Sequence, residues 1–291
     1  MFTRENVEFS TFIYNDRDVR SMAQSLSELG IHDIELFGMD NCHWHRGDIP
    51  EAVQAILREY KIASKSMHLT VAPIALEAVR DQAMDDMLEC LHFAYKIGAK
   101  KVVMHAGLIG KDATEEHKVV LAQAVRAIAL EAEKLNIKLL IENLPDYGRG
   151  VYGGTFEDLL DIYKRSGGQN VFFCYDVGHA RVNNQDIFAD FEKSLGRIEA
   201  VHLSDNFGMI STDNKYNDAH LPPLEGDLPW DKLLKLFFNY PTEVTLTLEV
   251  SQRATSDSRE AILERTLIAM EKLCMPYFSA TDDLGNGEVS C

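Results

Sequence analysis

Short runs of β-branched and aromatic residues alternate with longer amphipathic stretches along most of the chain, and this alternation is typical of repeated β-α units. Two of the runs, VVMH and FFCYD, are apolar at almost every position, as expected of parallel strands covered by helices. Eight runs can be counted, a number that closes a parallel sheet, and the sequence therefore predicts a (β/α)8 TIM barrel. The predicted strands are residues 7–14, 33–37, 63–69, 101–105, 138–143, 171–176, 200–204 and 244–250. Helical stretches are predicted at 16–29, 78–97, 114–135, 155–163 and 257–273.

The length of 291 residues suits one such barrel. Because no Pro/Gly/Ser-rich linker divides the chain, residues 1–278 are predicted to form a single catalytic domain. A polar tail at 279–291 is expected to be mobile. The connection at 206–227 is long, contains two adjacent prolines and has no helical period, and loops of this length often carry function.

Charge and cysteine usage narrow the possible partners. The chain has 29 Lys and Arg against 46 Asp and Glu, a net charge of −17 that repels nucleic acid and anionic membranes. Its five cysteines are scattered without a C-x-x-C spacing, which indicates free thiols in a reducing compartment. The first ten residues have no apolar signal region, and no later run reaches membrane-spanning length. We expect a cytoplasmic protein without nucleic-acid or membrane partners, and a homo-oligomer remains open.

Residues that can bind metal ions stand at the ends of the predicted strands. In a barrel of this type, the C-terminal strand ends and the loops after them form the active face. The loop at 206–227 adds two more candidates in a D-x-H spacing, which puts both side chains on one side of an extended segment. The candidate ligands are His68, His105, Glu142, Asp176, His179, His202, Asp218, His220 and Glu249.

Each of these residues alone has an ordinary structural explanation, because a strand-end His is often a hydrogen-bonded core group and an Asp often caps the next helix. Their convergence favours a metal centre, since several buried carboxylates facing one another need a cation to offset their charge. Nitrogen and oxygen ligands without a thiolate suit Zn, Mn, Co or Mg. A His-rich set favours zinc, and a Glu, Asp, His, Glu quartet accommodates manganese equally well.

The motifs LIENLPDYG, CYDVGHA, VHLSDNFG, DAHLPPLEGDLPW and LTLEV occur in this order. On these motifs, and over almost its whole length, the chain resembles the xylose isomerase-like TIM barrel superfamily. The superfamily includes sugar phosphate isomerases and epimerases, sugar-acid and inosose dehydratases, and the endonuclease IV family. Resemblance to the isomerase and epimerase branch implies one metal ion on Glu142, Asp176, His202 and Glu249. It also implies that Glu142 and Glu249 move a proton on and off the carbon beside a carbonyl, while His179 holds a substrate hydroxyl.

Resemblance to the endonuclease IV branch implies a larger centre of up to three zinc ions on all nine candidate ligands. Such a centre activates a water and clamps a phosphate, with Glu142 as the bridging carboxylate. The acidic composition opposes the DNA binding that a repair nuclease needs.

Two departures disfavour a ketose 3-epimerase. Enzymes of that kind carry a second Glu soon after the fifth-strand Glu and an Arg after the seventh-strand His, where this chain has Asp146 and the segment SDNFG. The leading hypothesis is therefore a metal-dependent isomerase or epimerase, or a dehydratase of the same mechanism, acting on a small sugar, sugar phosphate or polyol-derived carbonyl compound. The alternatives are a trinuclear zinc phosphodiesterase and a non-catalytic barrel that binds a sugar or a metal.

Overall fold

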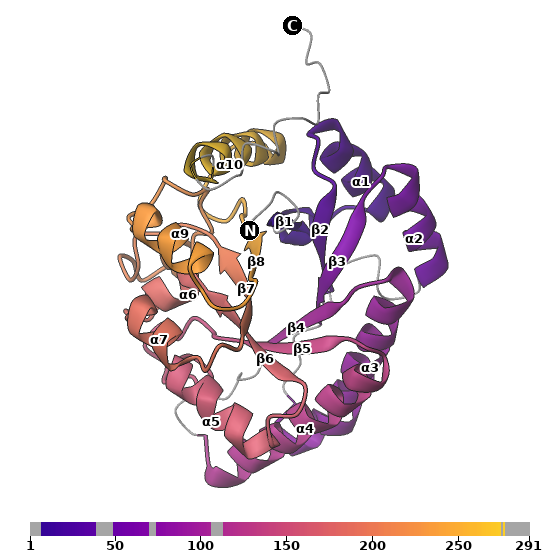
Figure 1. The fold of residues 1–291 in the computed structure, drawn as a ribbon, viewed down its shortest axis with the longest axis vertical. Helices are drawn as coiled ribbons and strands as arrows, with labels where there is room; N and C mark the ends of the chain where they lie inside the picture. Colours follow the sequence, from indigo (N-terminus) through magenta and orange to yellow (C-terminus); the bar gives the residue numbers. More distant parts are fainter. Residues whose placement is uncertain (1–6, 39–48, 70–73, 106–112, 275, 277–291) are drawn as a thin grey trace, which may run out of the picture.

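The computed structural model describes residues 7–38, 49–69, 74–105, 113–274 and 276. Its eight strands are parallel and pair in chain order, and β8 closes the sheet against β1 (Figure 1). This closed barrel confirms the predicted (β/α)8 fold. The strands are β1 (Val7–Ser10), β2 (Asp33–Phe37), β3 (Ala63–His68), β4 (Lys101–His105), β5 (Lys138–Glu142), β6 (Val171–Asp176), β7 (Ile198–Leu203) and β8 (Thr245–Leu248).

Helices surround the barrel on its outer side (Figure 1). The α-helices are α1 (Val19–Glu28), α2 (Pro50–Glu59), α3 (Arg80–Ile97), α4 (Glu115–Lys134), α5 (Phe156–Ser166), α6 (Val177–Val182), α7 (Ile187–Lys193), α8 (Asn214–Asn217), α9 (Trp230–Phe238) and α10 (Arg259–Cys274), and the 3-10 helices are η2 (Thr11–Tyr14) and η3 (Glu77–Val79). Among the described residues, every helix is too short or too polar to span a bilayer.

Alternate residues of each strand face the helices and the barrel interior. In β4, Val102 and Met104 belong to the large apolar core shared with the helices. Val103, between them, packs instead in a small apolar cluster inside the barrel. The position two residues further along the same inner face is His105, so the strand period itself carries this side chain to the barrel mouth.

The first strand is shorter than predicted. Residues 7–14 read as one extended run, but β1 ends at Ser10 and the 3-10 helix η2 follows. The Ser10 hydroxyl accepts a hydrogen bond from the backbone N–H of Phe12 at 3.4 Å, which favours a turn over continued extension. The expected tail at 279–291 lies outside the described residues.

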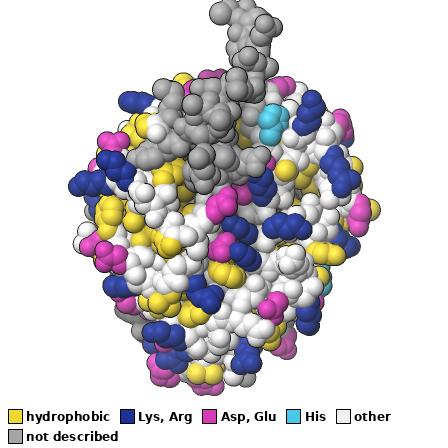
Figure 2. Space-filling view, in the orientation of Figure 1, with side chains coloured by type: hydrophobic (Ala, Val, Ile, Leu, Met, Phe, Trp, Pro, Cys, Tyr) yellow, Lys and Arg dark blue, Asp and Glu magenta, His cyan; other side chains and the backbone are white. Residues whose placement is uncertain are grey.

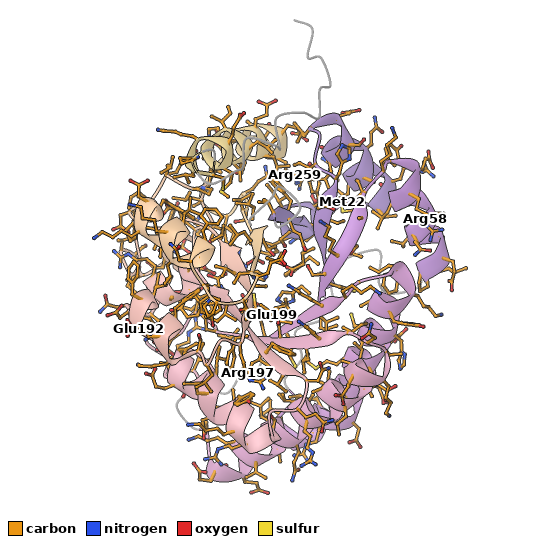
Figure 3. All side chains as sticks on the ribbon, viewed as in Figure 1. Met22, Arg58, Glu192, Arg197, Glu199 and Arg259 are labelled. Atoms are coloured by element: carbon orange, nitrogen blue, oxygen red, sulfur yellow. The ribbon has the colours of Figure 1, made fainter. Side chains whose placement is uncertain are left out.

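Ion pairs close the N-terminal end of the barrel. Lys138 lies 2.7 Å from the Glu199 carboxylate, and Lys101 donates to the Glu199 carbonyl at 2.8 Å and to the Thr245 hydroxyl at 2.9 Å. Figure 3 shows Glu199 near the centre of the barrel on this face. Lys and Arg are interspersed with Asp and Glu over the face in Figure 2, as expected where ion pairs serve stability.

Candidate metal centre

The candidate ligands gather at the opposite, C-terminal end of the barrel. His68, His105, Glu142 and Asp176 are the last residues of β3, β4, β5 and β6. The other strand-end ligands are His202 near the end of β7 and Glu249 directly after β8. His179 follows in the first turn of α6, and Asp218 and His220 lie in the loop after β7. The structure brings all nine predicted residues into three groups, each tight enough to hold one ion.

The first group is a buried quartet of Glu142, Asp176, His202 and Glu249. Each residue offers one oxygen or nitrogen, and these four atoms lie within 4.8 Å of one another. The Nδ1 atom of His202 is 3.1 Å from Glu142 Oε1 and 3.2 Å from Glu249 Oε2. The two glutamates thus approach the same imidazole nitrogen from β5 and from the end of β8.

The second group is His68, His105 and Glu142. The two Nε2 atoms lie 3.1 and 3.2 Å from Glu142 Oε2. Glu142 therefore turns one carboxylate oxygen to this group and the other to the quartet, which is the arrangement of a carboxylate that bridges two ions.

The third group is His179, Asp218 and His220. Asp218 Oδ1 lies 3.2 Å from Nε2 of His220 and 3.7 Å from Nε2 of His179. His220 has a φ of 47°, in the left-handed region that non-glycine residues seldom occupy, and such strain is common at functional sites.

Asp205 holds the loop that carries this third group. Its carboxylate accepts hydrogen bonds from the backbone N–H groups of Leu224 and Leu228 at 3.0 and 3.2 Å and from the Trp230 indole at 2.7 Å. Gly226 is required beside it, because a Cβ atom there would lie 2.2 Å from Asp205 Oδ1. The Asp of the SDN motif is thus a structural anchor for the loop.

Backbone carbonyls fix the orientation of three of the histidines. The Nδ1 atoms of His68, His179 and His220 lie 2.8, 2.8 and 2.9 Å from the carbonyl oxygens of Leu69, Asn143 and Glu249. An imidazole whose Nδ1–H donates to a carbonyl has a free lone pair on Nε2. In all three residues Nε2 is the atom that faces the other members of that histidine's own ligand group. This is the usual support of a metal-binding imidazole.

Unpartnered oxygens show that the groups fit a cation. Asp176 uses Oδ1 to cap α6, accepting from the His179 N–H at 2.6 Å, while the buried Oδ2 has no hydrogen-bond partner among the described residues. Asp218 Oδ1, although 3.2 Å from His220 Nε2, also lacks a partner in hydrogen-bonding geometry among the described residues. A buried carboxylate oxygen without a partner is costly, and a metal ion satisfies it. Asp176 can therefore cap α6 with Oδ1 and bind a metal ion with Oδ2 at the same time.

The electrostatics of the groups are strongly perturbed. Burial raises the pKa of Asp176 to about 6. Burial also acts to raise the pKa of Glu249, but the neighbouring His202 and His220 outweigh it and lower this pKa to about 2. For His220, burial is outweighed by Asp218 and Glu249, which raise its pKa to about 9. Without a metal ion, protons on the imidazoles balance the carboxylates, so a cation and protons compete for these groups.

Three residues of the site were missed by sequence reasoning. The Tyr147 hydroxyl donates to Asp218 Oδ2 at 2.9 Å, and Arg253 Nη1 lies 2.9 Å from the same oxygen. Both belong to irregular segments, where spacing gives no signal. Glu35 is completely buried inside the barrel in the middle of β2. A charged residue in the centre of the apolar run DIELF is the sequence feature that could have indicated it.

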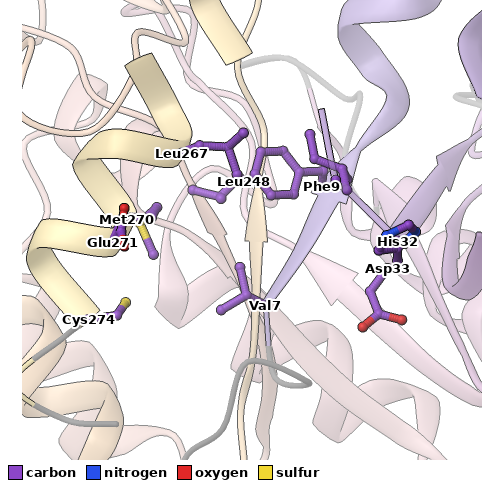
Figure 4. Close-up of a pocket in the computed structure, with 11 residues that line it drawn as sticks. Val7, Phe9, His32, Asp33, Leu248, Leu267, Met270, Glu271 and Cys274 are labelled. Atoms are coloured by element: carbon purple, nitrogen blue, oxygen red, sulfur yellow. The ribbon is translucent and has the colours of Figure 1, made fainter. Parts of the chain in front are cut away.

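A cavity of about 470 Å³ lies away from these groups, between α10 and the strands β1 and β8 (Figure 4). Val7, Phe9 and Leu248 line it from the strands, and Leu267 and Met270 line it from α10. None of the nine candidate ligands is among its lining residues, so it is separate from the candidate metal centre. A second cavity, of about 460 Å³, is lined by Tyr147, which bonds to Asp218, but by none of the nine candidate ligands.

The fold and this site define a (β/α)8 barrel with a His, Asp and Glu centre at its C-terminal face. The chain belongs to the xylose isomerase-like TIM barrel family, whose model matches residues 23–273. The uncharacterized protein MJ1311 of Methanocaldococcus jannaschii is 28% identical over 214 residues, which are 72% of this chain and 68% of the relative. A probable endonuclease 4 of Geotalea daltonii is 25% identical over 193 residues, 60% of this chain and 67% of the relative.

Solved structures show the same fold. A D-tagatose 3-epimerase-like protein superposes with a TM-score of 0.73 at 22% identity, covering 92% of this chain and 99% of its own. The IolI protein, described with a bound zinc atom, superposes with a TM-score of 0.76 at 15% identity, covering 94% and 99%. At such low identity these likenesses concern the fold alone. Structures with this fold thus include an epimerase-like protein and a protein with a bound zinc atom.

Proposed function

We propose that this protein is a metal-dependent isomerase or epimerase, or a dehydratase of the same mechanism, acting on a small polyhydroxylated carbonyl compound. The buried quartet carries the proposal, because Glu142 and Glu249 approach one point from different strands and His202 lies between them. The similarity in fold to epimerases supports it. Zinc or manganese suits the nitrogen and oxygen ligands.

A divalent ion on the quartet would polarise the substrate oxygens and make the hydrogen on the adjacent carbon more acidic. Glu142 or Glu249 accepts that proton, and the other glutamate returns a proton in an isomerase or epimerase. In the metal-free protein His202 and His220 lower the pKa of Glu249 against the effect of burial. A bound cation would keep this carboxylate ionised in their place, so that it is able to accept a proton. His179 has Nδ1 occupied by the Asn143 carbonyl, and its Nε2 remains to bind a substrate hydroxyl.

The test is turnover of Glu142→Gln and Glu249→Gln on a panel of ketoses, inososes and dehydroshikimate with added Mn or Zn. Each variant is expected to lose about 100- to 10,000-fold in turnover, the usual contribution of a general base. Incorporation of solvent deuterium at the carbon beside the carbonyl should fall in parallel. Glu157→Gln is the matched control, because Glu157 is an exposed α5 residue that pairs with Lys193. Full turnover by either site variant would reject the proton-transfer assignment, and a metal-loaded protein inert on the whole panel would favour a binding function.

The second candidate is a trinuclear zinc phosphodiesterase. The three ligand groups, with Glu142 shared by two of them, favour it specifically, and so does the similarity to a probable endonuclease 4. It predicts about three zinc ions per chain by elemental analysis and cleavage of a small phosphodiester such as bis(p-nitrophenyl) phosphate. His220→Ala would then remove one ion and abolish cleavage. A stoichiometry near one ion per chain would reject this candidate.

A further inference from the structure

Glu35 is a carboxylate inside the barrel that the reaction above does not use. It stands at the centre of β2 with no solvent exposure, and its neighbours Ile34 and Leu36 belong to the apolar core. A buried carboxylate persists only where other groups stabilise its charge or share its proton. The groups that contact Glu35 therefore indicate its function.

The contacts of Glu35 lead to the quartet. Both of its carboxylate oxygens lie 3.3 Å from Nε2 of His202. The other ring nitrogen, Nδ1, is the atom that faces Glu142 and Glu249. The imidazole of His202 thus lies between the quartet on one side and Glu35 on the other, and its two nitrogens have different neighbours.

We propose that Glu35 is a positioning residue that accepts a hydrogen bond from Nε2–H of His202 and so keeps Nδ1 directed at the metal ion with its lone pair free. The inference rests on the proposed function only in that the quartet binds a metal ion. Backbone carbonyls give this support to His68, His179 and His220. For His202 the acceptor is a carboxylate, which binds an N–H more strongly and also makes the imidazole a better donor to the metal.

Two further buried side chains, Ser66 and Glu8, lie beside Glu35. The Ser66 hydroxyl lies 3.4 Å from Glu35 Oε2 and donates to Glu8 at 2.5 Å. Glu8 is buried as well; among the described residues it has no contact with His202, and Ser66 lies between it and Glu35. It is therefore a matched control: a buried glutamate in the same layer of the barrel that does not contact the imidazole.

The experiment measures zinc affinity by chelator competition and the His202 ring by 15N NMR in the zinc-loaded protein. Glu35→Met, which keeps the length and removes the acceptor, is expected to weaken zinc binding 10- to 100-fold. The Nε2–H proton, strongly deshielded and slow to exchange in the wild type, should lose both properties. Glu35→Gln keeps an acceptor oxygen and should restore part of the affinity. Glu8→Gln should change affinity less than twofold.

Unchanged zinc affinity and an unchanged Nε2–H signal in Glu35→Met would overturn the proposal. If Glu35→Met does not fold, Glu35→Gln decides, because a loss of affinity no greater than that of Glu8→Gln would overturn it equally. Neither readout needs a substrate. If the protein turns over no compound of the panel, the proposed reaction is rejected and this inference still stands. If zinc affinity and the Nε2–H signal are unchanged in the Glu35 variants, this inference is rejected and the proposed reaction is not affected.

Discussion

The layer of side chains directly below the quartet has two unlike halves. On β4 to β7 the inward residues are Val103, Leu140, Cys174 and Ala200, which form an apolar cluster. On β8, β1, β2 and β3 the corresponding residues are Thr247, Glu8, Glu35 and Ser66, all of them buried. Barrel interiors are usually filled by branched apolar side chains, so the polar half is the one that needs explanation.

The two halves support different parts of the site. Leu140 and Cys174 lie two residues before Glu142 and Asp176 on the same inner faces, so the apolar half is the floor beneath these two carboxylates. A dry floor strengthens the interaction of these carboxylates with a cation. The polar half reaches His202 through Glu35. The comparison indicates that the polar side chains lie on the side of the barrel from which Glu35 approaches the His202 imidazole.

The largest expected effect comes from making the apolar half polar. Leu140→Asn keeps the number of side-chain heavy atoms and the branch at Cγ but buries an amide among Val103, Cys174 and Ala200. We expect it to lower the free energy of unfolding by about 3–5 kcal/mol, the combined cost of an unsatisfied amide and lost apolar burial. Urea denaturation of the metal-free protein measures this. Leu140→Met is the control and should cost less than about 1.5 kcal/mol. If Leu140→Asn and Leu140→Met lowered the unfolding free energy equally, the apolar half would tolerate polar groups. The difference between the two halves would then have no energetic basis.

Glu8 provides a smaller, pH-dependent test of the polar half. Burial, reinforced by Glu35, raises the pKa of Glu8 from 4.5 to about 7 against the opposing Ser66 hydrogen bond. The folded state thus binds a proton that the unfolded state releases between these values, and stability is lost as pH rises through 7. The shift corresponds to about 3 kcal/mol.

Glu8→Gln should remove this loss, so its unfolding free energy should exceed that of the wild type progressively from pH 4.5 and by about 3 kcal/mol at pH 9. Denaturation of both proteins across this range gives the difference directly. If the difference in unfolding free energy between Glu8→Gln and the wild type stays constant over this pH range, Glu8 is ionised throughout it. The polar half would then carry the negative charge of Glu8 at every pH tested.

The nine candidate ligands at the barrel mouth could be predicted from the sequence. The layer of inward side chains below them could not. Apolar runs such as 171–176 marked the strands, and the rule that barrel chemistry lies at strand ends selected residues such as His105 and Asp176. That rule directs attention away from mid-strand positions. In a parallel strand covered on both faces, moreover, apolar residues occupy both faces, so the pattern does not say which side points inward. Glu35 and Glu8 were missed for that reason.

The smallest effect is expected at Thr247, where the polar half ends. Its buried hydroxyl has no hydrogen-bond partner among the described residues, although its strand neighbours Glu8 and His202 are both polar. Because an unsatisfied hydroxyl is costly and valine has the same branched shape, Thr247→Val should raise the unfolding free energy by about 0.5–1 kcal/mol. Ser66→Ala is the contrasting variant, since its hydroxyl donates to Glu8, and it should lower stability by about 1–2 kcal/mol. A loss at Thr247 equal to that at Ser66 would mean that the hydroxyl is bonded in solution, and that the polar network continues across β8 instead of ending at β1.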